Sequence, residues 1–382
     1  MSNKKKIVFL TGTRADFGKL NPLMQMIEKS EDFECYIFVT GMHTLSKYGA
    51  TFQEVEKHKY KNIFVFMNQT NTTDQDIILA NTITGFSNFV KEISPDMIVI
   101  HGDRIEALAG AIIGAINNIL VSHIEGGEIS GTIDELIRHA ATKMSHLHFV
   151  SNDDAKRRLI QMGESNERIF VIGSPDIDVM KSNELPSIEQ VKEYYQIGFK
   201  NYGILIFHSV TTELNSLKDQ IENVVSAIIE SKKNFVIIYP NNDTGTDIIL
   251  EEYKKISRNK NFRIFPSLRF KYFLTLLKNA DCIVGNSSAG IREAEVYGIP
   301  TINIGSRQAN RSKNDQIINI EPIKNVILNS VFEIKNKKVN FKSNFSKNFD
   351  SAKKFYELLC DENIWNISCQ KQFIDFSNKK ET

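Results

Sequence analysis

The stretch His123–His139, HIEGGEISGTIDELIRH, concentrates carboxylates and imidazoles beside a pair of glycines. Glu125 ends an apolar run, and Asp134 lies where a helix is predicted to begin. Carboxylates crowded into one site push their pKa values apart, so that one accepts a proton while another keeps one. Thr132 and Glu135 have the spacing of a helix capping box, which accounts for part of the cluster. A metal site is disfavoured, because the spacing matches neither HExxH nor an EF-hand.

Other polar residues follow other apolar runs. Asp103 and Arg104 come directly after the run DMIVIHG, and His208 ends the run YGILIFH. Asp103 alone is also explained as a helix cap, and His208 alone as a structural histidine. Arg104 in a first helical turn opposes the helix dipole, which favours a role in meeting an anion. Arg14 and Lys19 flank another helix start, within TGTRADFGK, which is neither a GxGxxG motif nor a P-loop.

The most specific stretch is GNSSAGIREAEVYGIP, residues 285–300. Ser287 and Ser288 follow a predicted strand and precede a predicted helix. Hydroxyls and free N–H groups at a helix start suit a diphosphate. Glu293 is expected further into that helix, where a carboxylate accepts hydrogen bonds from ribose hydroxyls in other nucleotide folds. The alternative is a capping serine with a surface glutamate.

The elements that must position these residues form a regular series. Short β-branched and aromatic runs alternate with helical patterns such as RIEALAGAIIGAINN; the runs are KIVFLTGT, CYIFVTG, NIFVF, DMIVIHG, ILVSHIEG, LHFVSN and RIFVIGS. Such runs predict strands that are buried on both faces of a parallel sheet. Alternation with helices predicts the α/β class and a doubly wound sheet, in which ligands bind beyond the carboxyl ends of the strands.

A second series of runs follows a pause at residues 185–186: YGILIFHS, NFVIIYP, FRIFPS, DCIVGNS and PTINIG. Ser187 is a predicted helix N-cap there, with Glu189 nearby. The sequence therefore predicts two Rossmann-like domains, an N-terminal one over 1–185 and a C-terminal nucleotide-binding one over 186–363. Residues 309–350 are rich in Asn, Lys and Ser and carry little periodicity, whereas SAKKFYELLCDENIW is predicted to be helical.

Size and charge exclude several classes of protein. The chain has 382 residues, which favours two domains over one. Lys and Arg number 47 against 46 Asp and Glu, so no overall field favours nucleic acid or an anionic membrane. No apolar run approaches the roughly 18 residues of a membrane helix, and the N-terminal run predicts a buried strand rather than a signal peptide. Four cysteines without CxxC spacing argue against zinc and disulfides and fit a cytoplasmic location.

Six motifs together carry a resemblance to a known family: TGTRADFGKL, IHGDRIEALAG, HIEGGEISGTIDE, FHSVTTE, YPNNDTG and GNSSAGIREAEVYGIP. In order and spacing they resemble hydrolysing UDP-N-acetylglucosamine 2-epimerases of the bacterial sialic-acid-pathway type. The likeness extends to about residue 310 and resumes at IWNISCQKQFIDF. It implies a GT-B architecture, with the nucleotide between two Rossmann-like domains and a return helix at about 364–382 crossing back to the first domain.

The resemblance also implies a reaction, the conversion of UDP-N-acetylglucosamine and water to N-acetylmannosamine and UDP. A base removes the C2 proton while UDP leaves from C1, and water then adds to the resulting 2-acetamidoglucal. No metal and no cofactor is implied. The expected partners are UDP-N-acetylglucosamine and UDP, with no nucleic acid and no membrane, and the chain is expected to form a homo-oligomer, either a dimer or a tetramer.

The residues at positions that match the family's motifs take their expected roles from the resemblance. The resemblance implies that Asp103, Glu125 and Asp134 are catalytic carboxylates, whose division between base and acid stays open. His208 is implied to contact phosphate or to assist the leaving group. Ser209 is a departure, since relatives are expected to have proline there. The residues implied to bind the UDP-sugar are Arg14, Lys19, Arg104, Asn241, Phe273, Ser287, Ser288, Glu293 and Arg307.

Four other interpretations stay open. A sibling enzyme would act on a GDP- or UDP-linked diacetamido-trideoxyhexose for legionaminic acid. A non-hydrolysing epimerase would return UDP-N-acetylmannosamine, although GTRADFGK favours the hydrolysing branch over the GTRPE type by resemblance. A GT-B glycosyltransferase would need no C2 base, so the carboxylates argue against it. Non-catalytic sensing of a nucleotide-sugar is the fourth.

Overall fold

The computed structural model describes residues 4–308, 317–334, 350–372 and 374. Within them, the first half of the chain forms a parallel sheet of seven strands, in the order β3-β2-β1-β4-β5-β6-β7. Their bounds are β1 Lys5–Thr11, β2 Phe33–Val39, β3 Asn62–Val65, β4 Met97–His101, β5 Leu120–Ile124, β6 Leu147–Val150 and β7 Ile169–Val171. Every predicted strand of the first series is therefore present.

The described part of the second half forms a parallel sheet of six strands, in the order β10-β9-β8-β11-β12-β13. Their bounds are β8 Gly203–Ile206, β9 Phe235–Ile238, β10 Phe262–Phe265, β11 Ile283–Gly285, β12 Thr301–Ile304 and β13 Ile317–Ile320. The strand β13 lies in the segment for which little periodicity was expected. It pairs with β12 through Thr301↔Ile317 and the three positions that follow, so a neighbouring strand supplies what the local pattern did not indicate.

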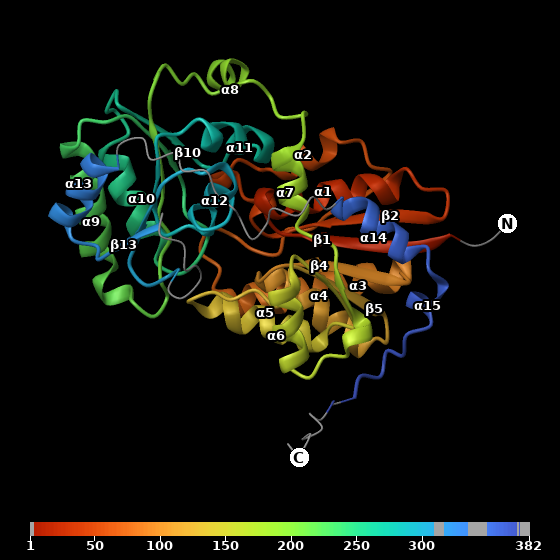
Figure 1. Ribbon diagram of the computed structural model, residues 1–382. Coiled ribbons are helices and arrows are strands. Elements are labelled where there is room, and N and C mark those ends of the chain that lie inside the picture. The colour runs from red at the N-terminus through yellow and green to blue at the C-terminus, as the bar shows by residue number, and fades with distance from the viewer. Residues whose placement is uncertain (1–3, 309–316, 335–349, 373, 375–382) are drawn as a thin grey trace, which may run out of the picture.

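Helices cover the sheets (Figure 1). In the first half they are α1 Arg14–Glu28, α2 Phe52–Lys57, α3 Gln75–Ile93, α4 Ile105–Ile116, α5 Ile133–Met144, α6 Asp153–Gln161 and α7 Pro175–Lys181. In the second half they are α8 Ile188–Tyr194, α9 Leu214–Glu230, α10 Thr246–Lys255, α11 Phe270–Lys278, α12 Glu293–Tyr297 and α13 Lys324–Glu333. Two more, α14 Ser351–Leu359 and α15 Glu362–Trp365, follow near the C-terminus. Short 3-10 helices are η1 Gly41–Thr44, η2 Ser46–Tyr48, η3 Asn166–Arg168 and η4 Ser288–Gly290.

In both sheets the order of the strands reverses at a matching point. In the first, β1 pairs with β2 on one side and β4 on the other; in the second, β8 pairs with β9 and β11. Loops that leave two neighbouring strands on opposite faces open a crevice at the carboxyl ends of those strands. The polar motifs after β1, β4, β8 and β11 therefore converge on two facing crevices.

The predicted helix cap at Ser187 lies between the last strand of the first sheet, β7, and the first strand of the second, β8. Ser187 caps α8, and its hydroxyl accepts a hydrogen bond from the Gln190 amide. The side chain that completes the capping box is Gln190 rather than the nearby Glu189, because the N3 position is the one that reaches back to the cap.

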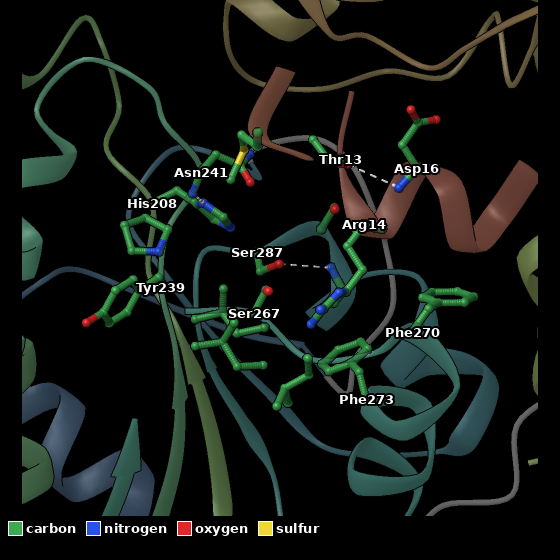
Figure 2. A pocket seen from close by; sticks show the side chains of 18 of the residues that line it. Thr13, Arg14, Asp16, His208, Tyr239, Asn241, Ser267, Phe270, Phe273 and Ser287 are labelled. Atoms are coloured by element: carbon green, nitrogen blue, oxygen red, sulfur yellow. Dashed lines mark hydrogen bonds between the residues drawn. The ribbon is translucent and has the colours of Figure 1, made fainter. Parts of the chain in front are cut away.

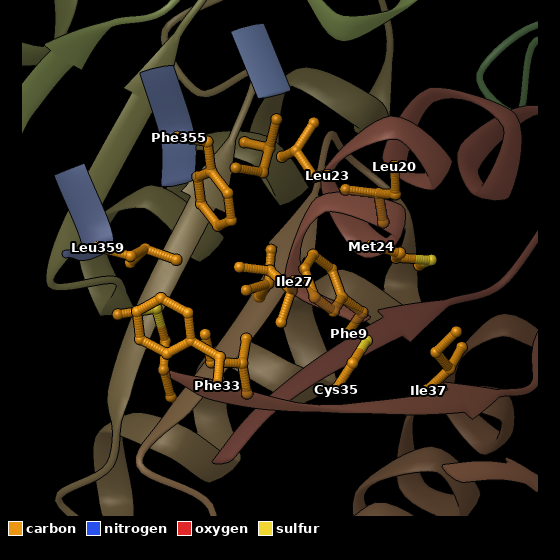
Figure 3. Close-up of a cluster of buried hydrophobic side chains, with 14 of the residues drawn as sticks. Phe9, Leu20, Leu23, Met24, Ile27, Phe33, Cys35, Ile37, Phe355 and Leu359 are labelled. Atoms are coloured by element: carbon orange, nitrogen blue, oxygen red, sulfur yellow. The ribbon is translucent and has the colours of Figure 1, made fainter. Parts of the chain in front are cut away.

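The chain returns to the first half earlier than predicted. Helix α14 packs against α1, with Phe355 fully buried between α1 and the strands (Figure 3). The predicted return helix at about 364–382 is wrong in this respect, since α15 ends at Trp365 and the described residues that follow it are not helical. Helix α14, which begins at Ser351, therefore already belongs to the core of the first half through Phe355. Residues 373 and 375–382 of that prediction lie outside the described residues.

The segment after α15 stays on the first half. The Lys371 ammonium donates to the carbonyl oxygen of Ser145 at 2.6 Å, at the end of α5, and lies 2.6 Å from the buried carboxylate of Glu164. A cation at a helix C-terminus stabilises the helix dipole, so this segment supports α5 from its far end. Among the described residues, no helix combines the length and apolarity that a membrane span requires.

Replacing Phe355 by alanine tests the return. Loss of a fully buried aromatic ring leaves a cavity between α14, α1 and the sheet, and we expect a loss of about 3–5 kcal/mol in the free energy of unfolding. Thermal and urea denaturation measure it. Phe332→Ala is the matched control, because that ring is 46% exposed on α13 and its removal should cost less than about 1 kcal/mol. Equal effects of the two substitutions would show that α14 does not hold the first half.

Candidate active site

A cavity of about 270 Å³ lies between the carboxyl ends of the two sheets (Figure 2). Every residue predicted for the site except Glu125 lines it. From the first half these are Arg14, Lys19, Asp103, Arg104 and Asp134, and from the second half they are His208, Asn241, Phe273, Ser287, Ser288, Glu293 and Arg307. Residues more than a hundred positions apart thus share one cavity.

Asp103 follows β4 and faces the cavity. Its carboxylate accepts a hydrogen bond from Arg138 of α5, whose guanidinium also donates to Ser130 Oγ at 3.3 Å. Arg138 is 4% exposed, so the ion pair is partly shielded from water. The structure therefore favours an oriented carboxylate over the helix-cap interpretation, since the cap position of α4 is taken by Arg104 without a side-chain hydrogen bond.

Asp134 is held at the start of α5. Thr132 is the helix cap, and its hydroxyl accepts from the Asp134 amide at 3.4 Å. The predicted capping box is not formed, because Glu135 accepts from the Ser130 amide instead of the Thr132 amide. The Asp134 carboxylate lies 3.0 Å from Arg307, yet its pKa is raised, because burial and the nearby Asp103 charge outweigh that cation.

Glu125 lies behind the cavity wall rather than on it. It is 3% exposed, has φ of 61°, and its amide donates to Phe149 at 3.0 Å. Burial alone would raise the pKa of Glu125, but Arg292 and Lys19 reverse this and hold the pKa well below its usual range. The glutamate is therefore a carboxylate in this structure.

His101 connects Glu125 to the cavity. Its Nε2 lies 3.3 Å from Glu125 Oε2, and its Nδ1 lies 3.1 Å from Asp16 Oδ1. Burial lowers the pKa of His101, but the two carboxylates raise it to about 9, so the ring is an imidazolium at neutral pH. Asp16 and His101 both line the cavity, although neither was among the predicted site residues.

His208 is held as a neutral donor. Its Nδ1 accepts from the Asn241 amide at 3.0 Å, which leaves Nε2 as the protonated nitrogen. Burial, followed by the charges of Arg307 and Arg104, keeps its pKa well below the usual value. Asn286 fixes the His208 backbone, accepting from its amide at 2.6 Å and donating to its carbonyl at 2.9 Å. The ring can therefore donate to an anion without carrying a charge.

The serine motif has a different local shape from that predicted. Ser288 begins the 3-10 turn η4, and Glu293 is the first residue of the short helix α12 rather than a residue further along it. The Ser287 hydroxyl accepts from the Ala289 amide at 3.3 Å. The Glu293 carboxylate is 3.6 Å from Lys19 Nζ, so it contacts the first half of the chain.

Arg104 and Arg14 are two positively charged side chains that line the cavity. Arg104 Nη2 donates to Asn242 at 2.6 Å and Nη1 lies 3.4 Å from Asp243, which joins the two halves. Burial lowers the pKa of Arg14, whose side chain extends toward Phe273 in Figure 2. Half-buried guanidinium groups beside hydroxyls and a neutral imidazole suit a ligand with phosphate groups.

A family model described as UDP-N-acetylglucosamine 2-epimerase matches residues 25–359. The chain belongs to the UDP-N-acetylglucosamine 2-epimerase family. A UDP-N-acetylglucosamine 2-epimerase of Neisseria meningitidis serogroup B is 48% identical over 376 residues, covering 98% of this chain and 100% of that protein. A UDP-N,N'-diacetylbacillosamine 2-epimerase (hydrolyzing) of Legionella pneumophila is 34% identical, covering 93% of this chain and 95% of that one.

The fold is also that of solved family members. The crystal structure of Methanocaldococcus jannaschii UDP-GlcNAc 2-epimerase in complex with UDP-GlcNAc and UDP has a TM-score of 0.76 at 23% identity, and covers 93% of this chain and 99% of that chain. This epimerase chain therefore has the GT-B fold, as the resemblance implied.

Several residues of the candidate site are not predicted from the sequence. Arg292, Asp176 and His101 surround Glu125, and Arg138 orients Asp103. His101 could have been predicted from the sequence, because it ends a strand two residues before Asp103. Nothing in the local sequence pattern indicates a role for Arg292 or Asp176. Among the described residues, no group of three or more His, Cys, Asp or Glu side chains is arranged to hold a metal ion.

Gly131→Ala tests how the two halves of the epimerase site meet. A Cβ at Gly131 would lie 2.8 Å from the Arg307 carbonyl oxygen, so alanine must push this contact apart and weaken the Arg307–Asp134 pair. We expect kcat/KM for the epimerase reaction to fall about tenfold, since small displacements of reacting groups are costly. Gly198→Ala is the control, because no atom lies within 4 Å of its Cβ position. Steady-state kinetics of both variants decide, and an unchanged Gly131→Ala rate contradicts the prediction.

Proposed function

We propose that the protein is a hydrolysing UDP-N-acetylglucosamine 2-epimerase, which converts UDP-N-acetylglucosamine and water to N-acetylmannosamine and UDP. The product would feed sialic acid biosynthesis. One observation carries the proposal: carboxylates from the first half face hydroxyls, a neutral histidine and an arginine from the second half across one cavity. The 48% identity to an epimerase of this substrate, over nearly the whole chain, supports the choice of UDP-N-acetylglucosamine.

The second half suits a diphosphate that gains charge as it leaves. Ser287 and Ser288 present hydroxyls to the cavity, and His208 presents its Nε2–H. Arg307 is 6% exposed and points from the second half toward Asp134. Preorganised donors of this kind stabilise developing negative charge best where water is excluded. We therefore propose that this wall binds and releases UDP.

The first half suits proton transfer at the sugar. The C2 proton is weakly acidic, so its removal has to be concerted with departure of UDP from C1. Asp103 and Asp134 face the cavity, and Glu125 reaches it through His101. The raised pKa of Asp134 suits it to give a proton to C2 during hydration of the glycal, and we propose that Asp103, which also faces the cavity, takes the C2 proton. Glu125 stays ionised behind the wall and holds His101 as an imidazolium. No step requires a metal or a cofactor.

The second candidate is a sibling activity on a UDP-linked diacetamido sugar. The relative from Legionella pneumophila, 34% identical along most of both chains, favours keeping it. The name of that relative also states hydrolysis, which supports the hydrolysing branch for this chain. The two candidates differ at the sugar C4 and C6 rather than at C1 and C2, so the same carboxylates and the same diphosphate wall serve both.

Three substitutions test the carboxylates. Asp103→Asn, Glu125→Gln and Asp134→Asn each remove an ionisable carboxyl of the proposed catalytic group, and we expect kcat to fall by about 10²–10⁴ while UDP still binds. Isothermal titration with UDP and turnover of UDP-N-acetylglucosamine measure the two effects. Asp219→Asn is the control, since this carboxylate is exposed on α9. Near wild-type turnover in all three variants would exclude the proposed chemistry.

Product analysis tests the reaction itself. Incubation with UDP-N-acetylglucosamine in D₂O should give free UDP and N-acetylmannosamine that carries deuterium at C2, because the C2 proton exchanges with solvent in the elimination route. NMR follows both products. Formation of UDP-N-acetylmannosamine would identify the non-hydrolysing reaction. Turnover of UDP-N,N'-diacetylbacillosamine with inert UDP-N-acetylglucosamine would identify the sibling.

A further inference from the structure

Glu125 meets an arginine that the proposed reaction has not used. Arg292 Nη1 lies 2.6 Å from Glu125 Oε2, and Nη2 lies 2.7 Å from Oε1. Two parallel charge-assisted hydrogen bonds of this kind fix the orientation of both planar groups. Arg292 does not line the cavity, so it is not placed to touch the sugar or the diphosphate directly.

The origin of Arg292 distinguishes it from the other described partners of Glu125. Lys19 on α1, His101 at the end of β4 and Ser174 before α7 all belong to the first half. Arg292 belongs to the second half and lies 167 positions along the chain from Glu125. The bidentate pair therefore joins a carboxylate of the first half to the turn that follows β11.

That turn is also the proposed diphosphate wall. The Arg292 amide donates to the Ser288 carbonyl at 2.9 Å, so the two residues share one tight turn. Ser287 and Ser288 of this turn line the cavity, whereas the Arg292 side chain does not and contacts Glu125. A displacement of the turn moves the guanidinium and changes the pair.

A second cation is shared within the same buried cluster. Lys19 Nζ lies 3.3 Å from Asp176 Oδ2 and 3.6 Å from Glu293 Oε1, but 3.8 Å from Glu125. Asp176 also lies 3.5 Å from Arg292. Lys19 is therefore divided among three carboxylates, and Arg292 is the closer and better-oriented cation for Glu125.

We infer that Arg292 is a positioning residue that links the diphosphate-binding turn to Glu125, holding this carboxylate ionised and aligned while the UDP-sugar is bound. The inference rests on the proposed function. The pair with Glu125 and the backbone hydrogen bond to Ser288 are made by one residue, so the carboxylate and the turn keep a fixed relation to each other.

The charges around Glu125 act on its pKa in the direction that the inference requires. Burial pushes the pKa of Glu125 up, and Arg292, Lys19 and His101 push it down. The other charged groups around Glu125 are carboxylates that pair with the same cations. Asp16 pairs with His101, Asp176 and Glu293 pair with Lys19, and Glu128 lies near Arg292. Removal of Arg292 therefore raises the pKa of Glu125. A carboxyl group with a raised pKa stays protonated to a higher pH, so the acidic limb of the rate profile moves up.

The test compares pH profiles of kcat/KM for wild type, Arg292→Met and Arg292→Lys. We expect the acidic limb of Arg292→Met to move up by about 1–3 pH units, because the nearest opposite charge is lost. Arg292→Lys should move it less, because lysine keeps the charge but lacks the parallel donors. Profiles lowered by a constant factor at every pH would overturn the inference, since that result indicates a structural role alone.

Two further measurements keep the outcome clear. UDP affinity from isothermal titration should change by less than about threefold in Arg292→Met, because the side chain does not line the cavity. A tenfold weaker UDP affinity with an unmoved acidic limb would overturn the inference and assign Arg292 to nucleotide binding. Thermal midpoints of Glu125→Gln, Arg292→Met and the double variant should be non-additive, since the two side chains are in contact. Additive midpoints would also overturn it.

The control is Arg263→Met, which removes a half-buried guanidinium of the second half that donates to the Tyr195 carbonyl, away from the cavity. Its profile should overlie that of wild type. Failure of the proposed function gives a different result, namely a wild-type enzyme that releases no N-acetylmannosamine. An active wild type with unmoved Arg292 profiles overturns only the present inference. If Arg292→Met does not fold, Arg292→Lys alone decides by the same comparison.

Discussion

Parallel strand pairing is the constraint on which the rest of this structure depends. Because β1 pairs with β4, and β8 with β11, all in parallel, the loops that carry polar side chains leave each sheet at one edge. The two edges face each other, and the cavity lies between them. Neither half alone encloses the site: the first supplies carboxylates, and the second supplies the hydroxyls, His208 and Arg307.

That arrangement requires charges to be buried, which is costly unless each charge is paired. The molecule pairs them across the halves: Glu125 with Arg292, Asp134 with Arg307, and Glu293 with Lys19. Removal of one partner leaves the other buried and uncompensated. The contacts between the halves are therefore also the contacts that set the protonation states within the site.

Much of the fold was predictable because the signals are local. Strands buried on both faces are visible as apolar runs, and Ser187 as a helix cap is visible within a few residues. The strand β13 and the start of the return at Ser351 were not predicted, because the first depends on pairing with β12 and the second on where Phe355 is buried. The motifs predicted which residues line the cavity, but Arg292 and Asp176 gain their importance only from contacts with residues far away in the sequence.

Glu125 illustrates why motif position and chemical role differ. Its motif predicts a catalytic carboxylate at a strand end, and the strand does end there, yet the side chain turns behind the wall with a left-handed backbone. Held by Arg292 and in contact with His101, which lines the cavity, it is oriented and shielded from water. The ionisation of this carboxylate therefore depends on an arginine of the turn after β11, which belongs to the other half of the molecule.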